Sequence, residues 1–328
     1  MDGEAPAAGP PRPGWRFWLR IVVSIGLLGV LIYKAPDPDE LLPDRHYLLT
    51  ALLLGAALLT TLLGIVLSAW RWQRVLTVFD AHVPPRPLVS HYLAGLFVGN
   101  VLPSTIGGDV LRVSRASATV GSATTAFGSV VLERLTGFVA LPLLVFAGFV
   151  ARPSMMDVER TWIASTVAAV TLASLSIILY LAGHPRIAGR FAEHENWMRF
   201  VGAVHLGVVR LRREPRNAIP VLGTALLYQG SVVVAVALIF RTLDLPVPLA
   251  AVFVYVPAVA MLQVLPLSFN GLGVREGMLV LFLRPWGVGS AQAIAAGLLW
   301  FFATLIVSVL GAPAFAIGSR KRSEVSTS

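Results

Sequence analysis

Long apolar runs, separated by short polar stretches, are the feature that most limits what this chain can form. Residues 47–70 and 122–150, among others, reach or exceed the roughly 20 residues that a helix needs to cross the hydrocarbon layer of a membrane. With 56% hydrophobic and 13% charged residues, the chain is too apolar for a soluble domain of its size. The alternation typical of membrane β-barrels is absent from the sequence. We therefore predict an all-α polytopic membrane protein.

The charges of the loops indicate how the chain crosses the membrane. Arginines precede the first apolar run and follow the last one, and cytoplasmic loops are enriched in Lys and Arg. Both termini are therefore predicted to be cytoplasmic. The formal net charge of +9 fits such basic loops, so we expect no nucleic-acid partner. The six predicted spans are residues 15–33, 47–70, 122–150, 162–181, 218–240 and 290–317.

Two pairs of apolar segments are too short to cross. The first pair is residues 88–101 and 110–118, and the second is residues 249–265 and 274–283. Each pair is joined by a polar stretch that contains Gly and Pro. Irregular backbone is tolerated inside a membrane only where protein or a watery cavity surrounds it, because an unpaired amide in hydrocarbon costs several kcal/mol. We predict two re-entrant helical hairpins, the first entering from the cytoplasm and the second from the opposite side.

The two polar stretches share a spacing. Pro103 is followed by a Gly after five residues and by Arg112 after nine, and Pro266 is followed by a Gly after five and by Arg275 after nine. Together with the opposite entry sides of the hairpins, this spacing predicts an inverted repeat, as found in many secondary transporters. The predicted boundaries are a disordered lead at 1–14, one membrane domain at 15–320 with repeat halves at 47–150 and 218–317, and a tail at 321–328.

Each polar stretch ends where a helix is predicted to start. The N-terminus of a helix presents free N–H groups and the positive end of the helix dipole, which attract anions such as phosphate. Asp109 is the predicted N-cap of the first such helix, and Gly273 or Asn270 takes this part in the second. Arg112 and Arg275 lie in or near the first turns. The other residues predicted to bind phosphate are Ser104, Thr105, Gly108 and Gly271. The alternative is a Pro/Gly kink with an Arg that reaches the membrane surface.

Glu133 and Arg134 lie well inside a long apolar run. Each charge costs roughly 2.5 to 3.5 kcal/mol at the membrane centre on insertion scales, so both are expected to face the bundle interior or water. The expected partners are Asp109, Arg112, Arg275 and Glu276 across the two halves. These charges are predicted to bind the substrate, whereas the alternative is a purely structural ion-pair network. Glu133 and Glu276 are also candidates for carrying protons.

Trp70, Arg71, Trp72 and Arg74 close the second predicted span. Aromatic rings beside arginines are typical of a cytoplasmic helix end at headgroup depth. A lipid headgroup could dock on these residues, and plain anchoring is the alternative.

Residues 183–216 carry seven arginines and three glutamates. Their apolar residues recur at roughly helical spacing, which favours an amphipathic helix on the cytoplasmic surface. A basic loop without helical structure is the alternative.

Several kinds of chemistry find no support in the sequence. The chain has no cysteine, which excludes disulfides, thiolate nucleophiles and Cys-based metal sites. The six histidines are scattered without the spacing of metal ligands. A Walker A pattern and a Gly-x-Ser-x-Gly elbow are both missing. We therefore expect no metal and no cofactor.

Four motifs, in this order, resemble one known family. They are Ser-Ala-Trp-Arg-Trp from Ser68, Leu-Pro-Ser-x-x-Gly-Gly-Asp-x-x-Arg ending at Arg112, Val-Leu-Glu-Arg-Leu-Thr-Gly from Val131, and Gly-Leu-Gly-Val-Arg-Glu ending at Glu276. The chain resembles, from about residue 15 to 320, the lysylphosphatidylglycerol synthase transmembrane family. This is the flippase-like region of bacterial multiple peptide resistance factors, which also occurs as stand-alone proteins.

The resemblance implies a protein of the bacterial plasma (inner) membrane that moves a polar, phosphate-bearing lipid, anionic or zwitterionic, between leaflets. In fused members a soluble synthase domain makes aminoacylated phosphatidylglycerol, and this sequence of 328 residues has no room for that domain. Stand-alone relatives are linked to other lipids, including polyprenyl-phosphate sugars and hopanoid-type lipids, so the lipid is left open. A second copy of the chain and a lipid-synthesis enzyme are candidate partners.

Two other functions compete with transport. One is a membrane enzyme that acts on a lipid headgroup with Asp109 or Glu276 as general base. The other is a non-catalytic scaffold for a lipid-synthesis enzyme. The scaffold predicts that changes of charge at Arg112, Glu133 and Arg275 are harmless as long as the protein folds.

Overall fold

A bundle of long apolar helices forms the body of the protein. The computed structural model describes residues 47–101, 107–188, 198–264 and 271–316, and every regular element in these residues is a helix. Five of the helices are long and apolar enough to cross a membrane, and each begins within three residues of its predicted start. The predicted first span, residues 15–33, lies outside the described residues. The five are α3 (Tyr47–Val78), α6 (Ala123–Ala151), α7 (Thr161–Gly183), α9 (Pro215–Thr242) and α12 (Ser290–Val309).

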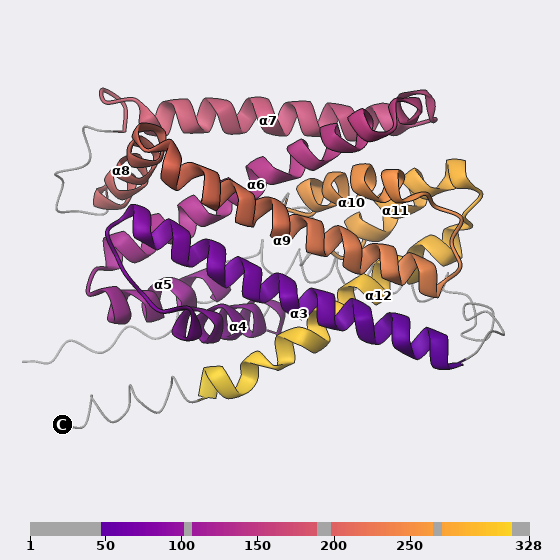
Figure 1. The fold of residues 1–328 in the computed structure, drawn as a ribbon, viewed down its shortest axis with the longest axis horizontal. Coiled ribbons are helices and arrows are strands. Elements are labelled where there is room, and N and C mark those ends of the chain that lie inside the picture. Colours follow the sequence, from indigo (N-terminus) through magenta and orange to yellow (C-terminus); the bar gives the residue numbers. More distant parts are fainter. Residues whose placement is uncertain (1–46, 102–106, 189–197, 265–270, 317–328) are drawn as a thin grey trace, which may run out of the picture.

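Two pairs of shorter helices lie among the long ones. α4 (Pro85–Val101) packs against α5 (Gly107–Val120), and α10 (Leu249–Gln263) packs against α11 (Val274–Leu283). Figure 1 shows the α4/α5 pair toward the end of the bundle that also holds α8, and the α10/α11 pair toward the opposite end. The short segments of the sequence therefore form helix pairs, as predicted.

The contacts between helices follow the same scheme in the two halves of the chain. α3 and α9 lie side by side and run in opposite directions (Figure 1). α6 contacts α10, and correspondingly α12 contacts α4. α5 packs on α6, as α11 packs on α12. Each helix of one half thus has a counterpart in the other half with equivalent neighbours.

Helix α8 (Arg199–Arg213) lies within the basic segment between α7 and α9. Its apolar face is buried through Ala203 and Val208, and Val208 packs in a cluster with Val75 and Leu132. Its last turn carries Arg210, Arg212 and Arg213. The amphipathic helix is confirmed for these residues, and the basic loop is wrong there.

The last described residues, which follow α12, contact the α4/α5 pair. The guanidinium of Arg115 donates to the carbonyl oxygens of Ala314 and Phe315, at 2.9 and 3.0 Å. The ring of Phe97 lies 6.0 Å from that of Phe315. A Cβ at Gly311 would overlap the carbonyl oxygen of Leu93, so this close approach of two backbones needs glycine. The segment that follows α12 therefore packs directly on the hairpin of the first half.

Two predicted helix boundaries are wrong. α3 continues for two more turns beyond Trp70, to Val78, because Trp72, Val75 and Leu76 have an apolar core to pack in at that end. α5 begins at Gly107, so Asp109 lies inside its first turn and is not its N-cap.

Candidate functional site

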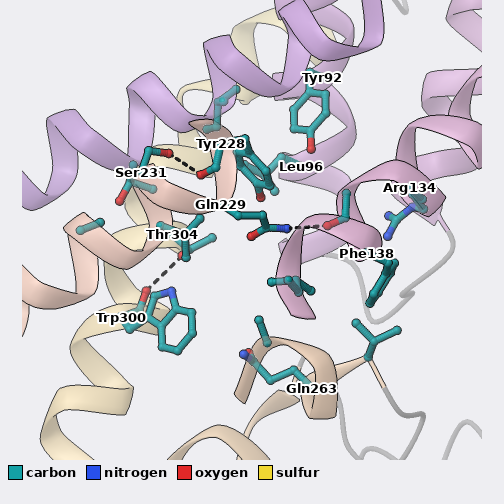
Figure 2. A pocket seen from close by; sticks show the side chains of 18 of the residues that line it. Tyr92, Leu96, Arg134, Phe138, Tyr228, Gln229, Ser231, Gln263, Trp300 and Thr304 are labelled. Carbon is teal, nitrogen blue, oxygen red and sulfur yellow. Dashed lines mark hydrogen bonds between the residues drawn. The ribbon is translucent and has the colours of Figure 1, made fainter. Parts of the chain in front are cut away.

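A cavity of about 310 Å³ lies in the middle of the bundle, lined by residues of α3, α4, α5, α6, α9, α10, α11 and α12. Figure 2 shows part of its lining, with side chains from both halves of the chain turned toward one space. Its charged lining residues are Arg71, Arg112, Glu133, Arg134 and Arg275. Its uncharged polar lining residues are Thr61, Tyr92, Asn100, Tyr228, Gln229, Ser231, Gln263 and Thr304.

Glu133 on α6 is held between two arginines from other helices. One carboxylate oxygen accepts a hydrogen bond from Nη2 of Arg71 on α3. The other accepts from Nη2 of Arg112 on α5, at 3.1 Å. Glu133 is 1% exposed, Arg71 3% and Arg112 4%, so three charges are removed from solvent together. A buried carboxylate is tolerated only with such partners, because desolvation of an unpaired charge costs several kcal/mol.

Aromatic rings hold the guanidinium of Arg112 in place. Its Cζ lies 4.4 Å from the ring centroid of Trp72 and 4.3 Å from that of Tyr92. The rings are themselves fixed, since Nε1 of Trp72 donates to Ser129 at 3.0 Å and the Tyr92 hydroxyl accepts from Ser68 at 2.9 Å. Arg71 similarly lies over the ring of Tyr228 on α9, 5.1 Å from its centroid. The site is thus rigidly built before any ligand binds.

Asp109 extends the ion-pair network toward Arg134. Its carboxylate lies 2.6 Å from Nη2 of Arg134 and 3.6 Å from Nη1 of Arg112. The side chain of Arg134 is half exposed and lines the cavity (Figure 2), whereas Asp109 does not line it. Asp109 therefore positions two arginines of the site.

Glycines make room for the buried arginines. A Cβ at Gly137 would lie 2.6 Å from Nη1 of Arg71, and one at Gly95 would lie 2.7 Å from Cγ of Arg112. A Cβ at Gly108 would overlap the carbonyl oxygen of Gly95. Gly108 is thus needed for the close packing of α4 on α5, and it does not line the cavity.

The second half contributes Arg275 and Glu276 at the start of α11. Gly273, with φ of 84°, is the N-cap, as predicted, and its N–H donates to Glu276 at 2.6 Å. Nε of Arg275 lies 3.6 Å from the same carboxylate. The Cζ of Arg275 lies 5.4 Å and 5.3 Å from the ring centroids of Trp300 and Phe301. Arg275 lines the cavity, while Glu276 is fully buried behind it.

The structure brings four of the twelve predicted substrate-binding residues to the cavity lining. Arg112, Glu133, Arg134 and Arg275 line one cavity. Gly271, with φ of 75°, lies in the turn before α11, where a left-handed backbone favours glycine. Two of the four predicted partners of Glu133 and Arg134 are confirmed, since Arg112 pairs with Glu133 and Asp109 pairs with Arg134. The predicted pairing across the two halves is wrong, because Arg275 pairs with its neighbour Glu276. Three predicted residues, Ser104, Thr105 and Asn270, lie outside the described residues.

Two of the four residues predicted to dock a lipid headgroup at the membrane surface, Arg71 and Trp72, do not lie at the surface. Trp70 and Arg74 are exposed, as an interfacial position requires. Arg71 and Trp72 are buried and face the cavity network instead. Residues 70 to 74 form continuous helix, so alternate side chains point in different directions and only part of the motif can face the membrane surface.

Sequence reasoning finds Arg112 as a partner of Glu133 but misses Arg71, the second partner. It also misses the rings of Tyr92 and Tyr228, which lie against Arg112 and Arg71 respectively. Ser68 and Arg71 lie three residues apart in an apolar helix and share one face, which was an available signal for an inward position.

Comparison with known proteins agrees with the motifs. No curated protein and no solved structure matches the chain at a significant level. The family described as "Lysylphosphatidylglycerol synthase TM region" matches residues 17–311, which is most of the sequence and includes all the described cavity residues. The chain therefore belongs to the family of the lysylphosphatidylglycerol synthase transmembrane region.

Proposed function

We propose that this protein moves a polar, phosphate-bearing lipid between the two leaflets of the bacterial plasma membrane. The observation that carries the proposal is the charged cavity in the middle of a bundle of membrane-length helices. Intramembrane charges are costly and mark substrate pathways in many membrane proteins. The family of the chain links it to lipid biology.

The charge of the cavity favours an anion. Among the described residues, four arginines line it and one carboxylate does, that of Glu133. Nε and Nη1 of Arg71 and Nε of Arg112 are buried and have no hydrogen-bond partner among the described residues. Guanidinium groups bind phosphate well because several N–H donors lie in one plane. A headgroup phosphate would supply acceptors for these donors while the acyl chains stay in the bilayer.

We further propose that the two halves form an inverted repeat and that the α4/α5 and α10/α11 pairs are re-entrant hairpins. The equivalent contacts of the halves and the antiparallel course of α3 and α9 support this arrangement. Movement of one half against the other would open the cavity to each side in turn. A gradient of ions or of the lipid itself would supply the energy, since the sequence contains no Walker A pattern.

The competing enzyme function has weaker support. Asp109 is engaged by Arg112 and Arg134, and Glu276 by the N–H of Gly273 and by Arg275. A general base needs to reach the proton that it removes, and neither carboxylate lines the cavity. Transport needs no such group.

Reconstitution into liposomes tests the proposal. Leaflet exchange of an acyl-labelled phospholipid would be followed by dithionite bleaching for the natural protein, Arg112→Ala and Arg275→Ala. We expect exchange to fall by at least about tenfold in both variants, since each loses a charged hydrogen-bond donor worth about 1.5–3 kcal/mol. Arg241→Ala, an exposed arginine outside the cavity, serves as the matched control and should exchange lipid normally.

Folding and site effects are separated by two further measurements. Arg112→Lys keeps the charge but loses the planar donor set, so it should fold like the natural protein and recover only part of the exchange. The melting temperature in detergent checks that each variant is folded. Normal exchange by folded Arg112→Ala and Arg275→Ala would contradict the proposal and favour the scaffold.

A further inference from the structure

We infer that the transported lipid carries one net negative charge and a neutral, hydroxyl-bearing headgroup, and that lipids with amino groups on the headgroup are disfavoured. This inference rests on the proposed transport function and narrows its substrate. It follows from three observations on the cavity: its charge balance, the pairing of the described carboxylates and of most described aromatic rings with arginines, and the chemistry of the remaining lining.

The described charges of the site leave one positive charge in excess. The arginines are Arg71, Arg112, Arg134 and Arg275, and the carboxylates are those of Asp109, Glu133 and Glu276. Residues 102–106 and 265–270, which lie outside the described residues, contain no acidic residue in the sequence. A phosphodiester brings one negative charge and makes the buried set neutral, which is the least costly state in a low-dielectric interior. A lysyl ester on the headgroup would add positive charge to a site that already has an excess.

Among the described residues of the site, no carboxylate is left to pair with an amine. Both oxygens of Glu133 are taken by Arg71 and Arg112. Asp109 is taken by Arg112 and Arg134, and it lies outside the lining. Glu276 also lies outside the lining, fully buried beside Arg275.

Four of the five described aromatic rings that line the cavity, all except Phe138, are occupied in the same way. An ammonium group can bind over an aromatic face, as in the cages that recognise quaternary amines. Here Arg112 lies over Trp72 and Tyr92, and Arg71 lies over Tyr228. In the second half, Arg275 lies over Trp300 and Phe301. At all of the described lining rings except Phe138, the protein's own guanidinium groups thus take the position over the ring that a headgroup amine would need.

The rest of the polar lining suits hydroxyl groups. Eight uncharged polar side chains line the cavity, and hydroxyl and amide groups can both donate to and accept from an alcohol. Gln229 uses its Nε2 for the carbonyl of Gly137, at 3.3 Å, which leaves its Oε1 as an acceptor (Figure 2). The Tyr92 hydroxyl accepts from Ser68, so its own proton remains for donation. Figure 2 shows Tyr228, Gln229 and Trp300 around the same space.

Three lipids with equal acyl chains test the inference in proteoliposomes. Phosphatidylglycerol has the phosphodiester and hydroxyl groups, phosphatidylmethanol has the phosphodiester alone, and lysylphosphatidylglycerol adds amines. We expect phosphatidylglycerol to exchange at least about tenfold faster than lysylphosphatidylglycerol. The repulsion between one added positive charge and an arginine at contact distance, at an effective dielectric constant of about 20, is large enough to slow exchange by more than tenfold. Phosphatidylmethanol should exchange about two- to tenfold more slowly than phosphatidylglycerol, because it lacks the hydroxyl groups and so loses about one neutral hydrogen bond.

The outcomes separate the inference from the transport function. Equal or faster exchange of lysylphosphatidylglycerol would overturn the inference and leave transport standing. Equal exchange of phosphatidylmethanol and phosphatidylglycerol would overturn the hydroxyl part. No protein-dependent exchange of any of the three lipids would contradict the transport function itself.

A pair of charge variants provides an independent check. Gln263→Glu adds a carboxylate to the lining with almost no change of shape, and it should reduce the preference for phosphatidylglycerol over the lysyl lipid by about threefold or more. Gln292→Glu makes the same change at an exposed position at the start of α12, where it keeps the acceptor for the N–H of Gly289. It should leave the preference unchanged. Identical preferences in folded Gln263→Glu and in the natural protein would overturn the electrostatic argument.

Discussion

Glu133 is the residue on which the charge balance of the site depends. It is 1% exposed and separates two guanidinium groups that would otherwise repel each other across the cavity wall. Its two oxygens tie α3 and α5 to α6. Its main role is therefore to hold the arginines in place.

The variant Glu133→Gln should lower the stability of the protein by about 3–5 kcal/mol, because it leaves Arg71 and Arg112 buried without a counter-charge. Unfolding by SDS in mixed micelles would measure this loss. Glu159→Gln is the matched control, since Glu159 pairs with Arg160 but its side chain is 71% exposed. Surface pairs contribute at most about 1 kcal/mol, so the control should stay close to the natural protein. If Glu133→Gln were as stable as the natural protein, the buried ion-pair network would not contribute to the stability of the fold.

At the scale of helices, the α4/α5 pair depends on small residues. Gly95 and Gly108 face each other so closely that Gly108 has no room for a side chain. The missing side chain of Gly95 also makes room for Arg112, whose Cγ lies in the space that a side chain on Gly95 would take. Close packing through glycine is typical of helix contacts inside membranes, where van der Waals contact must replace the hydrophobic effect.

Gly108→Ala should therefore destabilise the protein by about 1–3 kcal/mol, because the added methyl group forces the two helices apart. Gly99→Ala in the same helix pair is a matched control. Its Cβ would meet only the Cα of Gly108, at 4.0 Å, and alanine favours a helix by up to about 1 kcal/mol over glycine. Thermal unfolding in detergent should thus show a lower midpoint for Gly108→Ala and an equal or higher one for Gly99→Ala. A similar midpoint for both variants would contradict the packing argument.

At the scale of the whole molecule, the two ends of the bundle differ in charge. Among the described residues, the end that holds α8 exposes Arg74, Arg86, Arg186, Arg212, Arg213 and Arg216, with Asp80 and Glu214 as the exposed acidic residues. The opposite end exposes Arg152, Arg241 and Arg284 together with Asp157, Glu159 and Asp244. Basic loops are retained on the cytoplasmic side, so the α8 end is expected to face the cytoplasm.

The absence of cysteine makes this orientation easy to measure. Single-cysteine variants Glu214→Cys and Glu159→Cys place a thiol at exposed positions at the two ends. A membrane-impermeant maleimide applied to intact cells, with a permeable outer membrane where one is present, should label Glu159→Cys and spare Glu214→Cys. Both should react after the inner membrane is lysed. The reverse pattern would invert the orientation, and labelling of both in intact cells would contradict a cytoplasmic α8 end.

The helices, the two short helix pairs and most of the charged site residues can be predicted from the residues alone. These depend on local properties, namely the length of an apolar run, the effect of Gly and Pro on the backbone, and the cost of a charge inside a membrane. Three features become visible only in the folded molecule: the inward direction of Arg71 and Trp72, the sharing of Glu133 by Arg112 with Arg71 rather than with Arg275, and the position of the arginines over the aromatic rings. These features depend on how each helix is rotated about its own axis and on which helix packs against it, and such choices are fixed by contacts between residues far apart in the chain.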